Sequence, residues 1–369
     1  MKRCVFHYLQ PIEDKPGIGS ALRPNKMLHA FEAIGYQVDE VTGSSSERVE
    51  KILQIKQNIE NGICYDFVYS ESVNSPTILS DYDHIPRHPF ADFMFFKFCR
   101  QKGIPVGLFY RDVHWKFPVY KSVSLWKRLL LIPLFRYDLH MYHKVLDILY
   151  LPSKRMEEVV LGYNSIPLPP GGVLQTEQLA NRCEKRQQSD RLRVFYVGNV
   201  MGVYNVQKLC MAVKETANVE LTICTPESSW NQVSQTYKPY LCDRIRIVHK
   251  SSHELKPYFE ETDIFACCLE TNEYIQLAMP IKVAESIGYG VPVLITSGIA
   301  AADFINTEGC GWVVDYTVDA IKNKFQNLLD DPQEVDIATK NAVVAAPRHT
   351  WEMRAQQVAN DLKELRKEI

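Results

Sequence analysis

Short apolar runs rich in β-branched and aromatic residues alternate with longer segments of helical spacing along both halves of the chain. The runs of the first half are CVFHYL, YQVDEVTG, DFVYSE, PVGLFYRD and DILYLP, and those of the second half are RVFYVGN, VELTICTP, RIRIVHK, DIFACCL and PVLITS. Strand-like runs separated by helices are typical of βα units around a parallel sheet. The pattern therefore predicts two α/β domains in tandem.

The polarity of the chain changes between positions 162 and 190, where PLPPGGV is followed by the charged NRCEKRQQSD. A chain of 369 residues is also long enough for two domains. We predict a first domain over 1–170, a linker over 171–190 and a second domain over 191–345. The remaining segment, 346–369, contains HTWEMRAQQVANDLKELRKEI and is expected to form a helix that packs across the domain boundary.

Charge and cysteine content narrow the classes of function. The chain has 42 Lys+Arg against 44 Asp+Glu and a net charge of −2, so no global basic field favours nucleic acid. Its ten cysteines are scattered and form no C-x-x-C pair, which indicates reduced core residues. The start, MKRCVFHYLQP, is interrupted before a signal peptide could form, and no apolar run approaches the roughly 20 residues of a membrane span. We expect a cytoplasmic protein.

The strongest local signal is AMPIKVAESIGYGVPVLITS, in which a loop, a helix, a tight turn and a strand follow one another. Ligands of open α/β sheets bind at the carboxyl ends of strands, where a helix N-terminus offers free N–H groups to a phosphate. Lys282 would lie beside that anion, and the carboxylate of Glu285, one turn further on, could accept hydrogen bonds from ribose hydroxyls. The alternative is a solvated helix with an ion pair.

This segment resembles the donor-nucleotide motif of GT-B-fold glycosyltransferases of retaining family 4, where a P-x-K-x-x-E helix is followed by G-x-PV. The resemblance implies two Rossmann-like domains with parallel sheets facing a central cleft, and a C-terminal helix that returns to the first domain. It also implies transfer of a hexosyl-type sugar from a nucleotide diphosphate, with no cofactor and no metal. Family members often have a second Glu where this chain has Leu277, and Glu270 or Glu273 in the preceding loop is the candidate substitute.

The segment FYRDVHWKF places Arg111, Asp112 and His114 where a strand of the first domain ends. Loops at strand ends position polar groups over pockets. The resemblance implies that His114 faces the donor sugar. Arg111 and Asp112 either lie on the acceptor side or form an ion pair that braces the loop.

The loop PGIGSALRP follows the first strand and brings Gly17, Gly19 and Arg23 to or near a helix N-terminus. It lacks the third glycine of a dinucleotide fingerprint, so we reject an NAD site. The resemblance implies that Gly17 and Gly19 lie near the donor phosphates. Arg23 either lies on the acceptor side or braces the loop.

One position departs from the family pattern. The strand that opens the second domain is commonly followed by an Arg and, five residues later, a Lys, but this chain has Gly198, Asn199 and Tyr204 there. Either Lys282 and the helix dipole supply the phosphate binding, or other cations contribute, or turnover has been lost. The candidate contributors are Arg23, His249 and Lys250.

The stretch 115–144 interleaves aromatic and basic residues, as do helices that lie on a membrane. The alternative is an ordinary helix whose Leu129, Leu130, Ile132 and Leu134 enter the core. His84 and His88 lack the partners of a metal site, so a solvated loop is expected.

These observations favour a glycosyltransferase with His114 and Glu285 as catalytic residues, and with Gly17, Gly19, Gly198, Asn199, Lys282, Glu285 and Glu273 on the donor side. The expected partners are a nucleotide sugar and a glycan or lipid-linked acceptor, in cell-surface or exopolysaccharide synthesis, at the inner membrane face. Two alternatives stay open. One is a nucleotide-sugar epimerase on the same fold, and the other is a binding module without turnover.

Overall fold

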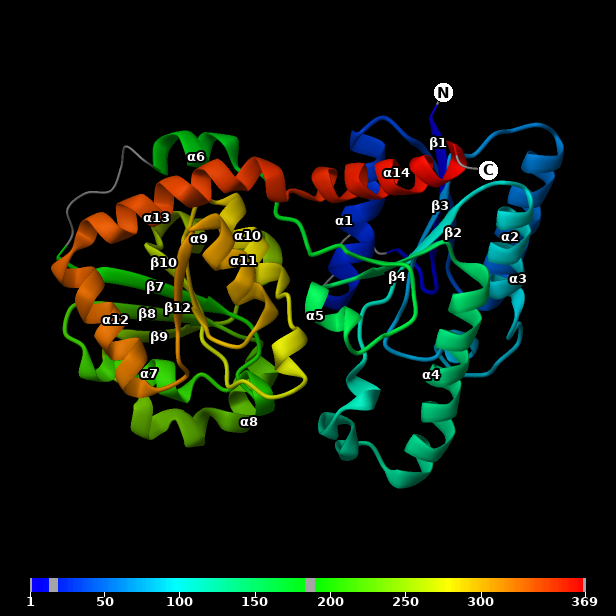
Figure 1. The fold of residues 1–369 in the computed structure, drawn as a ribbon. Helices are drawn as coiled ribbons and strands as arrows, with labels where there is room; N and C mark the ends of the chain where they lie inside the picture. The colour runs from blue at the N-terminus through cyan, green and yellow to red at the C-terminus, as the bar shows by residue number, and fades with distance from the viewer. Residues whose placement is uncertain (1, 13–18, 183–189, 368–369) are drawn as a thin grey trace. The chain divides into compact units, whose positions relative to one another are not determined.

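The computed structural model describes residues 2–12, 19–182 and 190–367, which fall into two compact units. The first unit comprises Met1–Pro169 and Trp351–Ile369, and the second comprises Pro170–Thr350. The predicted linker over 171–190 thus belongs to the second unit, where it includes helix α6 (Thr176–Arg182). Each unit is built on a sheet of six parallel strands, as the alternating pattern predicts (Figure 1).

The first sheet has the strand order β2-β1-β3-β4-β5-β6. Its strands are β1 (Arg3–Tyr8), β2 (Gln37–Thr42), β3 (Val68–Glu71), β4 (Val106–Phe109), β5 (Ile148–Leu151) and β6 (Ser165–Pro167). Its helices are α1 (Gly19–Ala33), α2 (Ser45–Glu60), α3 (Ala91–Gln101), α4 (Leu125–Val145), α5 (Lys154–Glu157) and α14 (Trp351–Lys367), with 3-10 turns η1 (Thr77–Leu79), η2 (His114–Lys116) and η3 (Pro118–Ser122). Strand β6 was not predicted, because three residues beside two prolines carry no alternating pattern.

Right-handed crossovers place the helices of this unit on two faces of the sheet. The chain passes from β1 outward to β2 and then back to β3, so α1 lies on one face and α2, α3 and α4 lie on the other (Figure 1). Helix α14 packs against α1, which confirms the return of the C-terminal helix to the first domain. Gly35 ends the α1 segment with a φ of +88°, as expected of a helix-closing glycine.

The second sheet has the strand order β12-β11-β10-β7-β8-β9. Its strands are β7 (Leu192–Val197), β8 (Val219–Cys224), β9 (Ile245–Val248), β10 (Ile264–Cys267), β11 (Val293–Thr296) and β12 (Gly311–Val314). Its longer helices are α7 (Gln207–Glu215), α8 (Glu227–Tyr237), α10 (Ile281–Gly288), α11 (Ala300–Glu308), α12 (Val318–Asp330) and α13 (Pro332–Ala345). The shorter ones are α9 (Lys256–Glu261), η4 (Gly202–Tyr204), η5 (Lys238–Tyr240), η6 (Ser252–Glu254), η7 (Ile275–Leu277) and η8 (Ala346–His349).

A single hydrophobic core runs through the second unit, around strands whose residues are buried on both faces. Five of the ten cysteines, at positions 210, 224, 267, 268 and 310, lie in this core as free thiols, and Cys183 lies outside the described residues. Burial raises the pKa of Cys267 to about 12, so this thiol stays protonated and unreactive. The cysteines of this core therefore act as small apolar residues.

Candidate active site

The strand order of the second sheet marks one place where a ligand is expected. Strand β7 has β8 on one side and β10 on the other. The chain runs from β7 to β8 and β9 on one side, and then crosses to β10 on the other side of β7. Ligands of open α/β sheets bind outside the carboxyl ends of the strands at such a switch point. The loop after β7 begins with Gly198 and Asn199, and the loop after β10 contains the exposed Glu270 and Glu273. Sequence analysis thus placed these four residues on the two loops that flank the switch point.

Helix α10 follows the β10 loop and begins at the same edge of the sheet. Its N-cap residue is Pro280, and no side chain caps its first turn. Its N-terminal N–H groups therefore remain available to an anion. Lys282 lies in the first turn, and its Nζ is 2.5 Å from Oε2 of Glu285, one turn later. Both side chains are partly exposed, at 23% for Lys282 and 18% for Glu285.

Two glycines let the chain pack tightly against this helix. A Cβ on Gly288 would lie 2.4 Å from the carbonyl oxygen of Val173, and one on Gly172 would lie 2.3 Å from that of Ala284. Both separations are too short for a side chain. Gly290 has a φ of +69° in the turn before β11, which only glycine adopts readily. Gly172, Gly288 and Gly290 thus allow close packing against α10 and the tight turn that follows it.

Asn199 and Tyr204 occupy the positions where the family pattern has its Arg and Lys. Asn199 stabilises the loop after β7. Oδ1 of Asn199 accepts hydrogen bonds from the backbone N–H groups of Val200, at 2.7 Å, and Met201, at 3.1 Å. The hydroxyl of Tyr196 donates to the carbonyl of Asn199 at 2.5 Å. Tyr204 ends the 3-10 turn η4 and is 39% exposed. Asn199 therefore shapes the loop after β7 and brings no positive charge to it.

Further polar groups at this edge come from the ends of β8 and β9. The hydroxyl of Thr225 is buried and has no hydrogen-bond partner among the residues that the structure describes. The backbone carbonyl oxygen of Thr225 lies 2.7 Å from Nδ1 of His249. Burial raises the pKa of Cys224, while the nearby charges of Lys282 and Lys250 oppose that rise. Lys282 therefore acts electrostatically on the thiol at the end of β8. Sequence analysis missed Thr225, although a hydroxyl directly after a buried strand was a usable signal.

Lys250, a candidate contributor to phosphate binding, is held by a local ion pair. Its Nζ lies 3.1 Å from Oε1 of Glu254, and this carboxylate raises the pKa of Lys250. Glu254 also accepts hydrogen bonds from Ser251, which lower the pKa of Glu254 to about 2. Lys250 and His249 are exposed at the carboxyl edge. Their role in phosphate binding stays a prediction.

In the first domain, His114 begins the 3-10 turn η2 after β4. Its backbone N–H donates to Oδ1 of Asp112 at 2.9 Å, and its ring Nδ1 lies 3.5 Å from Oδ2 of the same carboxylate. The imidazole packs against the rings of Tyr120, at 5.2 Å, and Phe135, at 5.8 Å. Nδ1 of His114 is buried and has no hydrogen-bond partner among the described residues. Asp112 and two aromatic rings thus orient this imidazole.

Arg23 and Arg111 meet at a buried carboxylate. Nε of Arg23 donates to Oε1 of Glu71 at 3.1 Å, and Nη2 of Arg111 lies 3.8 Å from Oε2. The guanidinium of Arg23 also lies over the ring of Phe109, 3.4 Å from its centroid. Burial raises the pKa of Glu71, and the two arginines oppose that rise. These contacts brace the ends of β3 and β4, and acceptor binding by Arg23 stays a prediction. Gly17 lies outside the described residues, and Gly19 is the first residue of α1.

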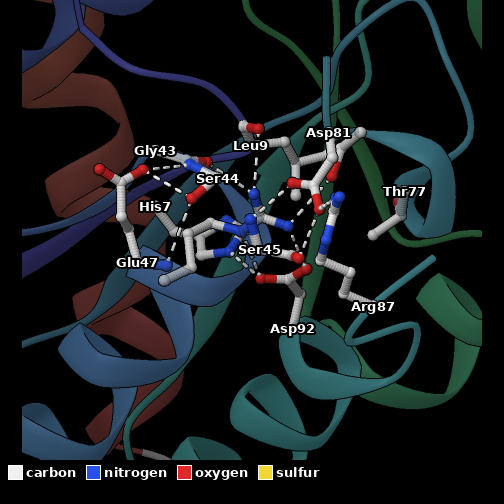
Figure 2. A network of polar contacts seen from close by, with 12 residues as sticks. His7, Leu9, Gly43, Ser44, Ser45, Glu47, Thr77, Asp81, Arg87 and Asp92 are labelled. Atoms are coloured by element: carbon white, nitrogen blue, oxygen red, sulfur yellow. Dashed lines mark hydrogen bonds and ion pairs between the residues drawn. The ribbon is translucent and has the colours of Figure 1, made fainter. Parts of the chain in front are cut away.

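A buried polar network that sequence analysis missed holds the loops after β1 and β2 (Figure 2). Arg48 of α2 and Asp92 of α3 form two parallel hydrogen bonds of 2.9 Å. The remaining N–H groups of Arg48 donate to the carbonyls of Leu9 and Gly43 and to the hydroxyl of Ser80. All five guanidinium donors are thereby satisfied, as a buried charge requires.

The same carboxylate fixes a histidine in β1. Nε2 of His7 lies 2.9 Å from Oδ1 of Asp92, and Nδ1 lies 2.8 Å from the hydroxyl of Ser70. Burial lowers the pKa of His7, so its ring is neutral, donates to Asp92 from Nε2 and accepts from Ser70. No proton acceptor for a substrate is left in this set, which indicates a structural role.

A hollow at the opposite edge of the second sheet is lined by Arg191, Arg193, Arg244 and Arg246. Arg193 pairs with Asp263 at 3.1 Å, Arg244 donates to backbone carbonyls and Arg246 lies over a tyrosine ring. These arginines hold the amino ends of β7, β8 and β9. The hollow is therefore remote from the carboxyl edge where α10 begins.

Among the described residues, no group of three or more His, Cys, Asp or Glu side chains could hold a metal ion. None of their helices combines the length and apolar character needed to cross a membrane.

A known protein family matches most of the second domain. Residues 191–331 match the family model described as glycosyl transferases group 1. A comparison of the sequence with curated proteins gives no match.

Among solved structures, the fold is similar to that of sucrose-phosphate synthase from Thermosynechococcus elongatus, with a TM-score of 0.66, 14% identity and coverage of 100% of both chains. It is also similar to Anabaena HepE in complex with UDP and glucose, with a TM-score of 0.64, 12% identity and coverage of 99% of this chain and 100% of that one. A third is WaaG, a glycosyltransferase involved in lipopolysaccharide biosynthesis, with a TM-score of 0.60, 14% identity and coverage of 97% of this chain and 99% of that one. The chain thus has the GT-B fold, and its resemblance to the glycosyl transferases group 1 is confirmed over most of its second domain.

Proposed function

We propose that this protein is a glycosyltransferase that moves a sugar from a nucleotide diphosphate to a hydroxyl acceptor. The observation that carries the proposal is the first turn of α10, where uncapped N–H groups and Lys282 lie at the carboxyl edge of the second sheet. A leaving diphosphate carries concentrated negative charge at the moment the glycosidic bond breaks. Preformed donors and a cation at that place lower the energy of the transition state.

In this proposal each candidate residue has one task. Lys282 and the N–H groups of α10 neutralise the diphosphate, and Glu285 accepts hydrogen bonds from the ribose hydroxyls. The 2.5 Å pair between Lys282 and Glu285 holds both side chains in place before the donor arrives. His114 orients the transferred sugar, because Asp112 and two rings hold its imidazole. Glu273 and the loop of Gly198 and Asn199 complete the donor side.

We propose a uridine diphosphate sugar as the donor. The similar structure of HepE is described in complex with UDP, with UDP and glucose, and with UDP-glucose. A hexosyl group and retention of the anomeric configuration follow from the family resemblance. The proposed reaction uses no cofactor and no metal, because Lys282 and the helix dipole supply positive charge.

We propose a glycan or a lipid-linked glycan as the acceptor, in cell-surface or exopolysaccharide synthesis. The description of WaaG as an enzyme of lipopolysaccharide biosynthesis supports this choice. Nucleotide sugars and lipid-linked acceptors meet at the cytoplasmic face of a membrane, so the proposed location is cytoplasmic and peripheral to the inner membrane face.

Product analysis with UDP-sugars tests the proposal. Transfer to an added acceptor, lost in the Glu285→Ala variant and kept in Glu215→Ala, would support it. Glu215 is a matched control because it also pairs with a lysine, Lys322, at 3.0 Å, but at the far end of α7. Conversion of the sugar without acceptor would indicate an epimerase. Nucleotide binding without turnover would indicate the binding module that the loss of the family's Arg and Lys suggests.

A further inference from the structure

We propose that the N-terminal half of α4 docks on the surface of an anionic lipid bilayer. Trp126, Leu129 and Leu130 are 81%, 59% and 61% exposed, and Pro133 is exposed as well. Spacings of three, four and seven residues place all of them on one side of the helix. The described residues of the protein leave this apolar stripe uncovered.

The opposite side of the same helix is already buried. Phe135 is 4% exposed and stacks on Trp115 at 5.4 Å with nearly parallel rings, and Tyr120 and Ile132 join the same cluster. A surface helix needs only one apolar face to pack on its protein. The alternative in which Leu129 and Leu130 enter the core is therefore wrong. Ile132 and Leu134 are partly buried, and Ile132 packs against this cluster. Helix α4 therefore has one apolar face that packs against the protein and a second apolar face that is exposed.

The exposed face continues beyond α4. Tyr137, one turn after Pro133, lies on the same side of the helix, and its ring contacts that of Phe90 at 6.5 Å. Phe90 and Met94, at the start of α3, are each 56% exposed. The apolar surface therefore spans two helices, and it is larger than the scattered exposed side chains that ordinary surfaces carry.

Charge identifies the partner. The 25 residues from Val113 to Tyr137 contain five Lys and Arg and no Asp or Glu, in a chain whose net charge is −2. Lys121, Lys127 and Arg136 are exposed around the apolar stripe. Basic residues that flank tryptophan and leucine match anionic headgroups above an acyl boundary. A second copy of this surface would instead place like charges face to face.

The docking surface is physically connected to the candidate site of the first domain. Tyr120 of η3 and Phe135 of α4, which pack against each other, are the same rings that hold the imidazole of His114. Docking would thus hold His114 close to the headgroup layer, where a lipid-linked acceptor presents its hydroxyls. The proposal does not depend on the donor site, because it rests on exposure and charge in the first domain alone.

Co-sedimentation with vesicles tests the proposal, without nucleotide. The full chain should bind vesicles of phosphatidylcholine and phosphatidylglycerol at least about tenfold more tightly than vesicles of phosphatidylcholine alone. Leu129→Glu/Leu130→Glu should abolish binding, whereas Ile337→Glu/Val344→Glu should retain it. Ile337 and Val344 of α13 are a matched control because they are 58% and 64% exposed.

Two further variants separate the contributions of charge and insertion. Lys121→Glu/Lys127→Glu should weaken binding at least about tenfold, and Lys238→Glu/Lys340→Glu, with the same change in net charge, should not. Trp126→Phe should still bind but lose the blue shift of tryptophan fluorescence on vesicles. The proposal is overturned if the native chain binds neither kind of vesicle. It is also overturned if Leu129→Glu/Leu130→Glu binds as tightly as Ile337→Glu/Val344→Glu. A third contrary result is a dimer, seen by sedimentation equilibrium, that Leu129→Glu/Leu130→Glu dissociates.

Discussion

Nζ of Lys282 lies 2.5 Å from Oε2 of Glu285 in the first two turns of α10. The pair is partly exposed, and it lies at a helix N-terminus that no side chain caps. An isolated surface pair of this kind contributes little to stability. Because ligands of open α/β sheets bind at the carboxyl edge of the sheet, we propose that the pair instead serves a diphosphate and a ribose.

Replacing Lys282 by Ala should weaken UDP binding by about tenfold to a hundredfold, the usual loss for one charge-assisted hydrogen bond. The melting temperature of the free protein should hardly change, since the pair is exposed. Titration calorimetry with UDP measures the affinity. Lys322→Ala removes a similar surface pair with Glu215 and should leave UDP binding intact.

Gly288→Ala should destabilise the second domain by about 1–3 kcal/mol, because the new Cβ would meet the carbonyl of Val173 at 2.4 Å. The helix must shift to relieve this contact, so UDP affinity should fall together with the melting temperature. Thermal unfolding with and without UDP measures both effects. Unchanged values in both would show that α10 is not held by this close approach.

The pH dependence of stability should reveal Asp138 of α4. Burial raises the pKa of this carboxyl from 3.8 to about 7. Among the described residues only its Oδ2 has a hydrogen-bond partner, the N–H of Thr77 at 2.7 Å. Between those pKa values the folded state holds a proton that the unfolded state has released. The free energy of unfolding should therefore fall as pH rises toward 7, by about 3 kcal/mol between about pH 5 and about pH 8.

Asp138→Asn keeps an acceptor for Thr77 and cannot titrate, so it should flatten this pH dependence. Urea unfolding of both proteins across the pH range measures the difference. Asp92 and the hydroxyls of Tyr110 and Tyr142, which interact with Asp138, are the same in both proteins and cancel in the comparison. Parallel curves for the two proteins would refute the assignment.

The buried pair of Arg48 and Asp92 should show strong coupling. Removing either partner leaves the other charge buried, which costs about 3–5 kcal/mol. Asp92→Leu combined with Arg48→Met should cost much less than the sum of the single changes, since no charge remains. A double-mutant cycle by urea denaturation measures the coupling energy. Additive losses would mean that the two side chains act independently.

His114→Ala should lower kcat by about a hundredfold and leave UDP affinity unchanged, because the imidazole is assigned to the transferred sugar. His140, an exposed histidine of α4, is the matched control, and His140→Ala should keep full turnover. Equal kcat values for the native protein and His114→Ala would remove His114 from the site.

Most strands could be predicted from the sequence, because apolar runs of four to six residues leave a strong local pattern. The switch point beside β7 was not predicted, since it depends on the strand order. Strands β6 and β12, of three and four residues, left a weaker local pattern and were not predicted. The pairing of Lys282 with Glu285 could also be predicted, since a spacing of three residues places both side chains on one face of a helix. The contacts of Asp92 with His7 and Arg48 could not be predicted, because these residues lie 85 and 44 positions from Asp92, in different elements that only the fold brings together. The exposure of Leu129 and Leu130 was equally hidden, since both faces of α4 are apolar.

The most direct test of the account is the change in melting temperature of the native protein and Lys282→Ala across UDP, GDP, ADP, CMP and the corresponding sugars. A ligand that binds only the folded state raises the melting temperature, by an amount equivalent to about 2.7 kcal/mol at a hundred times its dissociation constant. The account predicts a clear rise with UDP and its sugar for the native protein and a much smaller rise for Lys282→Ala. No rise with any nucleotide diphosphate, or equal rises for the two proteins, would contradict the assignment of α10 as the donor site.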